Sequence, residues 1–264
     1  MNGVMGLGPP NAGLMAPGSE PEARCLPANA RRVLIGRVPV DSGRLDDALG
    51  RVVRLVESGQ GGRVILPDVE HVVRAERDEA LREALATADL SLAGGPALVR
   101  AAERLGSPLV EPRSGAQWLP PLAGLARERA WRVVVVSDRP NVSERAAGVL
   151  RDTHGLLAVG VAAPDMPGNG RGPRVERLIE RIALTRPDLV WVSLATPTQE
   201  LFCLQAAAQL PRAVLVGAGP ALESLVEGRP GGRRRGPLWA PVRWLRQRWA
   251  FLRVLASMAP VPAR

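Results

Sequence analysis

The sequence has few of the residues that build disulfide, zinc or nucleophile sites. Its two cysteines, Cys25 and Cys203, lie far apart and outside any CxxC pattern, which fits a reducing cytosol and indicates neither a disulfide framework nor a zinc site. The two histidines, His71 and His154, accompany no GxSxG motif and no serine at triad spacing, so a hydrolase loses support. We interpret both histidines as surface or packing residues.

Long apolar runs are missing as well. The opening stretch "MNGVMGLGPPNAGLMAPGSEPEARCLP" has no charged start, and Pro and Gly interrupt every apolar segment. This pattern does not fit a signal peptide and predicts a disordered leader over residues 1–31. The 264 residues, 46% of them hydrophobic, are still enough for one sizeable core.

Lysine and tyrosine are absent, so arginine carries the positive charge, and that charge is unevenly distributed. The formal net charge is +9. Nine arginines and no acid follow Gly228, whereas the other 26 arginines are balanced by the 26 acids that precede it. We therefore expect an Arg/Trp-rich C-terminal appendage over residues 229–264.

The appendage contains the pattern of a basic amphipathic helix. On a helical projection its apolar side gathers Trp244, Leu245, Phe251, Leu252 and Leu255, and its basic side gathers Arg243, Arg246 and Arg253. Such a helix suits the surface of an anionic bilayer, although the stretch is too short and too charged to span one. Two alternatives stay open: packing on its own domain or on a partner subunit, and attraction to nucleic acid, which no recognised motif supports.

Between leader and appendage, strand-like and helix-like segments alternate. Runs such as "VVVV" and "LVWVSLA" lack polar alternation, as expected of strands covered on both faces. The fold class predicted for residues 32–228 is α/β, a Rossmann-like, doubly wound and mostly parallel sheet. Ligands of such sheets bind beyond the carboxyl ends of the strands, which predicts five rim segments: 66–71, 93–97, 137–141, 195–200 and 217–223.

One rim contains "SLATPTQELF". Thr196 and Gln199 have the spacing of a capping box, with Pro197 at the first helical position, so a helix start alone can explain them. That explanation leaves Glu200 without a role, and free N–H groups at a helix start can also hold phosphate or sugar oxygens. Both interpretations remain open from the residues alone.

Two other rims are rich in glycine. "VGAGPALESL" places Gly217 and Gly219 between a strand and a helix, where a diphosphate could approach the backbone, although GxGxxG is incomplete. Gly94 and Gly95 in "LAGGP" give a similar, weaker signal. A tight turn without a ligand explains either pattern equally well.

Taken in order, these segments resemble the WecG/TagA/CpsF glycosyltransferase family from about Val33 to Trp249. "RPDLVWVSLATPTQE", "LPRAVLVGAGPALESLVEG" and "RRRGPLW" carry the resemblance in the second half, and "LPDVEHVVRAERDEALREALATADLSLAGG" carries it in the first. The resemblance implies transfer of an N-acetylhexosamine from a UDP-sugar donor to a polyprenyl-diphosphate-linked acceptor, in cell-envelope polysaccharide synthesis. It also implies a cytoplasmic protein whose appendage meets the inner face of the membrane. We expect no cofactor and no metal, and a homo-oligomer stays open.

The resemblance also assigns residues. It puts Thr196, Pro197, Gln199 and Glu200 in the sugar-nucleotide site, Gly217 and Gly219 near the donor, and Arg235 facing diphosphate. Several family positions differ here: the threonine falls on Leu66, the asparagine on Asp68, and two aspartates, one of them the expected general base, on Gly94 and Gln117. A third aspartate falls on Glu223. Because glycine cannot accept a proton, Asp68 and Glu223 are the catalytic candidates, with Gly94, Gly95 and Gln117 assigned to substrate binding.

Three function classes follow. The first is an active, UDP-sugar-dependent glycosyltransferase. The second is a catalytically degenerate member of the family that acts as a noncatalytic ligand-binding or partner subunit, because Leu66, Gly94 and Gln117 differ together. The third is a basic adaptor for membranes or nucleic acid that performs no sugar chemistry.

Overall fold

A computed structural model describes residues 31–109, 115–139, 141–219, 221–222 and 240–258. The stretch predicted as a leader lies almost entirely outside the described residues, as does the first part of the predicted appendage.

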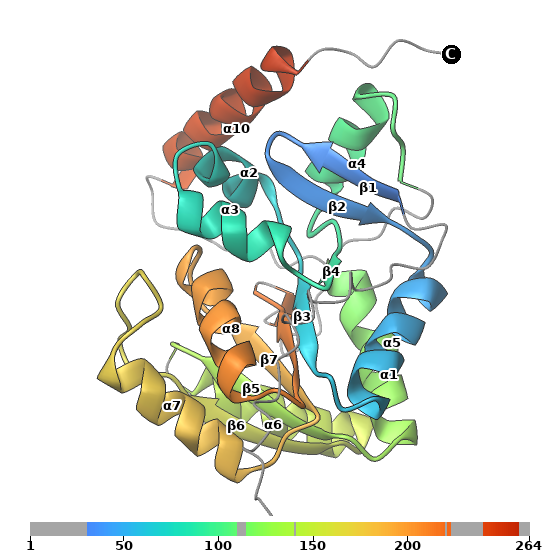
Figure 1. Cartoon of the computed structure of the whole chain (residues 1–264), viewed down its shortest axis with the longest axis vertical. Coiled ribbons are helices and arrows are strands. Elements are labelled where there is room, and N and C mark those ends of the chain that lie inside the picture. Colours follow the sequence, from blue (N-terminus) through green and yellow to red (C-terminus); the bar gives the residue numbers. More distant parts are fainter. Residues whose placement is uncertain (1–30, 110–114, 140, 220, 223–239, 259–264) are drawn as a thin grey trace, which may run out of the picture.

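A six-stranded, all-parallel sheet forms the centre of the molecule (Figure 1). Its order is β4-β3-β8-β7-β5-β6. The strands are β3 (Gly62–Ile65), β4 (Leu90–Ser91), β5 (Arg132–Ser137), β6 (Leu157–Ala162), β7 (Leu189–Ser193) and β8 (Val214–Gly217). In register, Trp191 of β7 lies between Val135 of β5 and Val216 of β8. The predicted α/β fold with a parallel sheet is confirmed.

Helices cover both faces of this sheet. One face packs against α1 (Leu45–Glu57), α5 (Gly115–Glu128) and α6 (Val142–His154), and the other against α7 (Pro173–Leu184) and α8 (Thr198–Gln209). Successive residues of β5 serve opposite layers, since Val135 belongs to the first apolar cluster and Val134 and Val136 to the second. Burial on both faces explains why these strands show no polar alternation.

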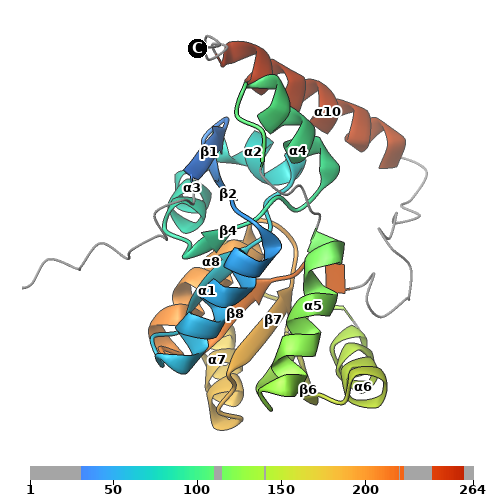
Figure 2. The ribbon, with the colours of Figure 1, turned by 90° about the vertical axis from the view of Figure 1, so that its right-hand side faces the viewer.

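A separate layer lies at one end of the sheet (Figures 1 and 2). It contains the antiparallel hairpin of β1 (Arg31–Ile35) and β2 (Val38–Ser42), together with α2 (Val69–Ala75), α3 (Glu79–Ala86), α4 (Pro96–Arg104) and α10 (Ala240–Ser257). These elements share a third apolar cluster. Because β3 leads into α2 and β4 leads towards α4, the layer stands over the carboxyl ends of the strands, where parallel sheets bind ligands.

Helix α10 docks on this layer through one stripe of side chains. Phe251 is buried in the third cluster, with Val254, Leu255 and Met258 packed beside it. The tight turn at Gly36 has a positive φ of 61°, and a Cβ there would lie 2.9 Å from Val254 Cγ1. Packing of the tail on its own domain is thus observed, and no described helix is long and apolar enough to cross a bilayer.

The apolar side predicted for the tail is divided between two faces. Phe251 and Leu255 face the domain, whereas Leu245 and Leu252 remain exposed, together with Trp249 at 65%. The projection was wrong because it assumed one apolar stripe, and the helix carries an inner and an outer one. The side chains of Arg243 and Trp244 lie outside the described residues.

Other differences from the sequence prediction are local. The segment "EHVVRAERDEALREALATAD", whose pattern predicts one helix, is two helices, because Asp78 accepts a hydrogen bond from the Leu81 N–H at 3.0 Å and so caps α3. The β-rich run "RRVLIGRVPVD", whose pattern predicts a strand before the first helix, is a hairpin and lies outside the main sheet. Helix α5 has no predicted counterpart, since Pro120 and Pro121 inside it argue against a helix.

Candidate functional site

His71 stands at the centre of a buried polar chain above the sheet. Its Nδ1 lies 2.8 Å from Asp68 Oδ1, and its Nε2 lies 3.0 Å from Glu200 Oε1. The His71 side chain is 7% exposed and that of Glu200 is 1% exposed. The histidine that had no role in the sequence therefore connects two rim segments that were predicted separately.

The start of α2 explains how Asp68 and His71 meet. Asp68 is the N-cap residue, and its Oδ1 accepts hydrogen bonds from the N–H groups of Glu70 at 2.9 Å and His71 at 3.3 Å. His71 occupies the third helical position, so its ring reaches back over the cap. Asp68 Oδ1 thus has three donors, and no hydrogen bond to its Oδ2 is found among the described residues.

The ring of His71 carries a positive charge in this setting. Burial alone would lower the pKa of His71, but the charge of Glu200 and hydrogen bonds to Asp68 and Glu200 outweigh it and raise that pKa to about 10. The Asp68 N–H also lies 3.1 Å from Nδ1. The Asp68 N–H could donate to Nδ1 only if Nδ1 carried no proton. An unprotonated Nδ1 would place its lone pair against the Asp68 Oδ1 oxygen, which is unfavourable, so we assign a proton to Nδ1.

The same interaction fixes the charge of Asp68. Burial by itself would raise the pKa of Asp68, but the hydrogen bond and charge of His71 lower it below its usual range. Asp68 is consequently ionised throughout the physiological range. Its proton affinity is reduced to the same degree.

Gln199 extends the chain from Glu200 to the end of β8. Its Nε2 donates to Glu200 Oε1 at 2.8 Å, and its Oε1 lies 3.4 Å from the Leu194 N–H. A Cβ at Gly217 would lie 3.0 Å from Gln199 Nε2, and one at Gly219 would lie 3.7 Å from Gln199 Oε1. Gly219 also has a positive φ of 46°, so the turn needs glycine for its backbone conformation.

The predicted capping box at the start of α8 is wrong. Helix α8 begins at Thr198 with Pro197 in the N-cap position, and it has no side-chain cap. Thr196 Oγ1 lies 3.4 Å from His71 Nε2, and the Thr196–Pro197 peptide bond is cis. The box does not form because Gln199 turns its amide inward, to Glu200 and Leu194, instead of back towards the helix start.

Gly94 lies in close contact with the turn after β3. Its N–H donates to the Pro67 carbonyl at 2.7 Å. A Cβ at this position would lie 2.4 Å from the Leu66 carbonyl oxygen and 2.7 Å from that of Pro67. No side chain, a carboxylate included, fits at Gly94 unless the backbone moves, whereas a Cβ at Gly95, the N-cap of α4, would meet open space.

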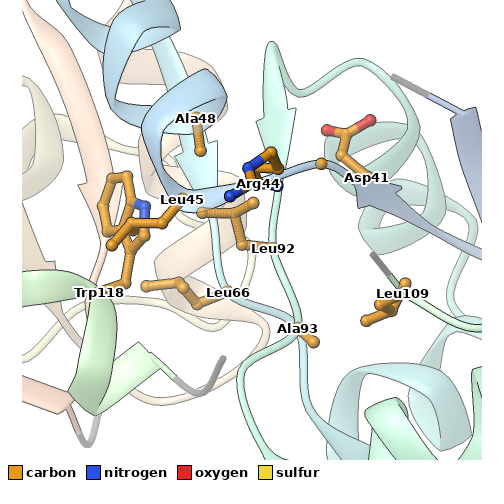
Figure 3. Close-up of a pocket in the computed structure, with 10 residues that line it drawn as sticks. Asp41, Arg44, Leu45, Ala48, Leu66, Leu92, Ala93, Leu109 and Trp118 are labelled. Atoms are coloured by element: carbon orange, nitrogen blue, oxygen red, sulfur yellow. The ribbon is translucent and has the colours of Figure 1, made fainter. Parts of the chain in front are cut away.

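A pocket is lined in part by Leu66 and by Ala93, the residue before Gly94 (Figure 3). Its lining is mainly apolar and consists of Asp41, Gly43, Arg44, Leu45, Ala48, Leu66, Leu92, Ala93, Leu109 and Trp118. Asp41 offers little to a ligand, because its carboxylate binds Arg32 Nε at 2.8 Å and the Ser91 N–H at 2.7 Å. Figure 3 shows that carboxylate turned away from Leu66 and Trp118.

Two buried polar atoms have no hydrogen-bond partner among the described residues close to these features. They are Glu200 Oε2 at the polar chain and Trp118 Nε1 at the pocket. Both belong to side chains that are at most 2% exposed.

The structure thus brings most of the predicted site residues to one edge. Asp68, Thr196 and Glu200 contact His71, and Gln199 contacts Glu200. Gly217 and Gly219 lie beside Gln199, Pro197 follows Thr196, and Gly94, with Gly95 after it, lies against the turn after β3. The side chain of Gln117 is exposed and is not among the pocket's lining residues. Glu223 and Arg235 lie outside the described residues. His71 was missed, and its one sequence signal is its place in the rim 66–71.

Comparisons with known proteins show what this chain is similar to. One relative, the N-acetylglucosaminyldiphosphoundecaprenol N-acetyl-beta-D-mannosaminyltransferase of Bacillus spizizenii, is 25% identical over 169 residues, which span 64% of this chain and 63% of that relative. A model described as "Glycosyl transferase WecG/TagA/CpsF family" matches residues 33–250, which include the sheet, the polar chain and most of α10. The chain belongs to the WecG/TagA/CpsF glycosyltransferase family.

Proposed function

We propose that this protein transfers a hexosamine-type sugar from a UDP-sugar to a polyprenyl-diphosphate-linked acceptor during synthesis of a cell-envelope polysaccharide. The observation that carries the proposal is the assembly of Asp68, Gln199, Gly217 and Gly219 at one edge of the sheet. The name of the Bacillus spizizenii relative describes a mannosaminyl transfer to a diphosphoundecaprenol-linked sugar, which supports this substrate class.

The donor side of the proposal rests on the end of β8. Gly217 and Gly219 are buried there beside the Gln199 amide, and we propose that the donor diphosphate lies next to this glycine-containing turn. Backbone N–H groups at the start of α8 favour negative charge. We assign the uridine diphosphate to this surface, with Arg235 as a further phosphate ligand from the appendage and no metal ion required.

The acceptor side rests on Asp68. The acceptor hydroxyl oxygen attacks the anomeric carbon, the bond from that carbon to the UDP oxygen breaks, and the hydroxyl proton passes to a carboxylate. Asp68 Oδ2 can take that proton while Oδ1 remains bonded to the α2 cap. Its lowered pKa makes it a weak base, so the proton moves late, as the new glycosidic bond forms. Glu223 is the second carboxylate proposed for this role.

The test is a transfer assay with purified protein, UDP-N-acetylhexosamines and a polyprenyl-diphosphate-linked sugar. We expect UDP release and a lengthened acceptor. Asp68→Asn should lower kcat by roughly 10² or more with little change in UDP affinity, because it removes the proton acceptor and keeps a capping side chain. Asp152→Asn, on the exposed surface of α6, is the matched control. The proposal would be overturned if the protein showed neither transfer nor donor hydrolysis with any substrate of the panel.

A second candidate is a noncatalytic family member that binds the donor. The contact of Gly94 with the Leu66 and Pro67 carbonyls favours this candidate. Backbone atoms occupy the space that a side chain at Gly94 would need, and the family resemblance places an aspartate at this position. This candidate predicts UDP binding in calorimetry without any transfer. Turnover that depends on Asp68 would exclude it.

The membrane part of the proposal rests on the outer stripe of α10. Leu245, Trp249 and Leu252 are exposed at 48%, 65% and 39% and recur at helical spacing, with exposed Arg246 and Arg253 nearby in sequence. Apolar and aromatic side chains flanked by arginine suit the headgroup region of an anionic leaflet. We propose that this stripe holds the protein to the inner face of the membrane.

Vesicle binding tests this assignment. The full chain should sediment with vesicles that contain phosphatidylglycerol, and much less with vesicles of phosphatidylcholine alone. Trp249→Ala should weaken the binding without a change in the far-ultraviolet circular dichroism spectrum. An affinity for duplex DNA that exceeds the vesicle affinity and falls steeply with salt would instead favour an adaptor function.

A further inference from the structure

The contact between His71 and Glu200 spans two strands that are not neighbours. His71 follows β3 and Glu200 follows β7, and β8 lies between these two strands in the sheet. The imidazole therefore bridges two turns over the carboxyl end of β8. Gly217, which is the last residue of β8, lies directly beside the Gln199 amide.

The bridge also orients Gln199. Glu200 Oε1 is shared between His71 Nε2 at 3.0 Å and Gln199 Nε2 at 2.8 Å. The amide nitrogen and the amide oxygen of Gln199 are both hydrogen-bonded, so this side chain is held against Gly217, and the residue is only 4% exposed. Glu200 itself is too buried to touch a ligand in this arrangement, so its effect on a ligand has to pass through its two partners.

Other charged groups near the bridge already have defined environments. Glu70 pairs with Arg74 at 2.9 Å on the neighbouring turn of α2. Arg63 of β3 is buried and donates to the Ala84 carbonyl and to Thr87 Oγ1. Burial first, and then the charge of Glu200, raises the pKa of the Cys203 thiol, against the opposing charge of Arg63, so Cys203 stays neutral. His71 is thus the cation that Asp68 and Glu200 both contact directly.

We propose that His71 is a positioning residue: bonded to Asp68 and Glu200, its ring clamps the turns after β3 and β7 across the end of β8 and thereby holds Asp68 in place beside the ligand and Gln199 against Gly217. The identity of that ligand as UDP rests on the proposed function. The contacts of His71 do not depend on the proposed function, so the clamp and the donor assignment can be tested separately.

Nitrogen NMR of the histidine rings tests the clamp without any ligand. The chain has two histidines, so His154→Gln leaves one ring spectrum and assigns it. At pH 8, well above the ordinary value of about 6.5, we expect both ring nitrogens of His71 to carry protons in the wild type and in His154→Gln. Glu200→Gln should remove that state. A His71 ring that is neutral at pH 8 in the wild type would overturn the proposal.

Calorimetry with UDP tests the consequence for the site. His71→Gln and Glu200→Gln should each weaken UDP binding by about tenfold or more, because each leaves one buried charge without its partner. The double variant His71→Gln/Glu200→Gln, in which two neutral amides can pair, should recover most of the affinity. His154→Gln should bind UDP as the wild type does. Folded single variants with wild-type affinity would overturn the clamp.

Hydrogen exchange separates the clamp from the proposed function. If the wild type binds no UDP, the donor assignment fails and the clamp is judged by exchange alone. Amides of residues 194–199 should then exchange about tenfold faster in Glu200→Gln than in the wild type, since the turn loses its anchor. Equal exchange rates in that segment would reject the clamp. This readout also serves if His71→Gln does not fold.

Discussion

The β3–α2 turn takes part in two regions of opposite chemistry, which we call its polar and its apolar side. On one side Asp68, His71 and Glu200 form a chain of charged groups with defined hydrogen bonds. On the other, Leu66 and Trp118 line a mainly apolar pocket. Leu66 and Asp68 are only two residues apart, so one short turn supplies both surfaces.

The resemblance to the family gives this difference a sequence counterpart. On the polar side the resemblance assigns Gln199, Glu200 and the glycines at the end of β8 to the sugar-nucleotide site, and His71 contacts the carboxylates of Asp68 and Glu200. On the apolar side it aligns Leu66 and Gly94 with polar residues of the family, and backbone fills the space at Gly94. On the proposed function, the donor site therefore follows the family pattern more closely than the acceptor site does.

Removing the histidine should produce the largest effect on the polar side. His71→Gln should lower the free energy of unfolding by roughly 3–5 kcal/mol, because it leaves the buried carboxylate of Glu200 without its cation and removes a charged partner of Asp68. Urea unfolding at pH 7 measures this loss. His154→Gln should change stability by less than about 0.5 kcal/mol, as expected of a site outside such a network. If both substitutions lowered the free energy of unfolding by the same small amount, the charged chain on the polar side would not contribute to stability.

Alkaline pH should weaken the polar side in the same way. The folded pKa of His71, about 10, exceeds its unfolded value near 6.5, so the native state binds a proton that the unfolded state has released. This stability is complete below about pH 6.5 and is lost as pH rises towards 10, by on the order of 5 kcal/mol. Urea unfolding at several pH values should show the decline in the wild type. The His71→Gln variant should lack this component.

The apolar side should respond to glycine substitutions in a position-specific way. Gly94→Ala should destabilise the protein by about 1–3 kcal/mol, because its Cβ would overlap the Leu66 carbonyl oxygen. Gly95→Asp should be neutral within about 0.5 kcal/mol, since its side chain enters open space at a helix N-cap. Thermal unfolding compares them. If Gly95→Asp also raises transfer activity, a missing carboxylate on this side limits catalysis.

The smallest effect on stability should come from the outer stripe of α10. Leu252→Ala should change the free energy of unfolding by less than about 0.5 kcal/mol and still reduce binding to anionic vesicles severalfold. Phe251→Ala, its neighbour on the buried stripe, should cost about 3 kcal/mol. Chemical denaturation and vesicle sedimentation together distinguish the stripes. Unchanged vesicle binding in Leu252→Ala would remove the outer stripe from the membrane surface.

The architecture could be predicted from sequence because it depends on local pattern. Fully buried strands such as β7 are continuous apolar runs, and in a parallel sheet the turn after each strand lies at the same edge. The rim segments containing Asp68 and Gln199 followed from those two facts alone. The two stripes of α10 did not, because a projection shows which residues share a face but not which face meets the domain.

The clamp could not be predicted because its members come together only in the folded chain. His71 and Glu200 are far apart in sequence, and neither has a motif that names the other. The capping-box spacing of Thr196 and Gln199 predicts that Gln199 bonds back to the helix start. Its amide instead bonds to Glu200 and to the Leu194 N–H. At Gly94 the deciding fact is the approach of the Leu66 backbone, which sequence spacing does not show.

The docking of α10 on α2 has a consequence for reach. Val254 of α10 and Val72 of α2 both lie against the turn at Gly36, and α2 is the helix that begins immediately after Asp68. Helix α10, the described part of the appendage, is therefore fixed to the domain by packing. A lipid-bound α10 would hold the reacting edge at a constant height above the bilayer, and that height would limit how long a lipid-linked sugar chain can be extended.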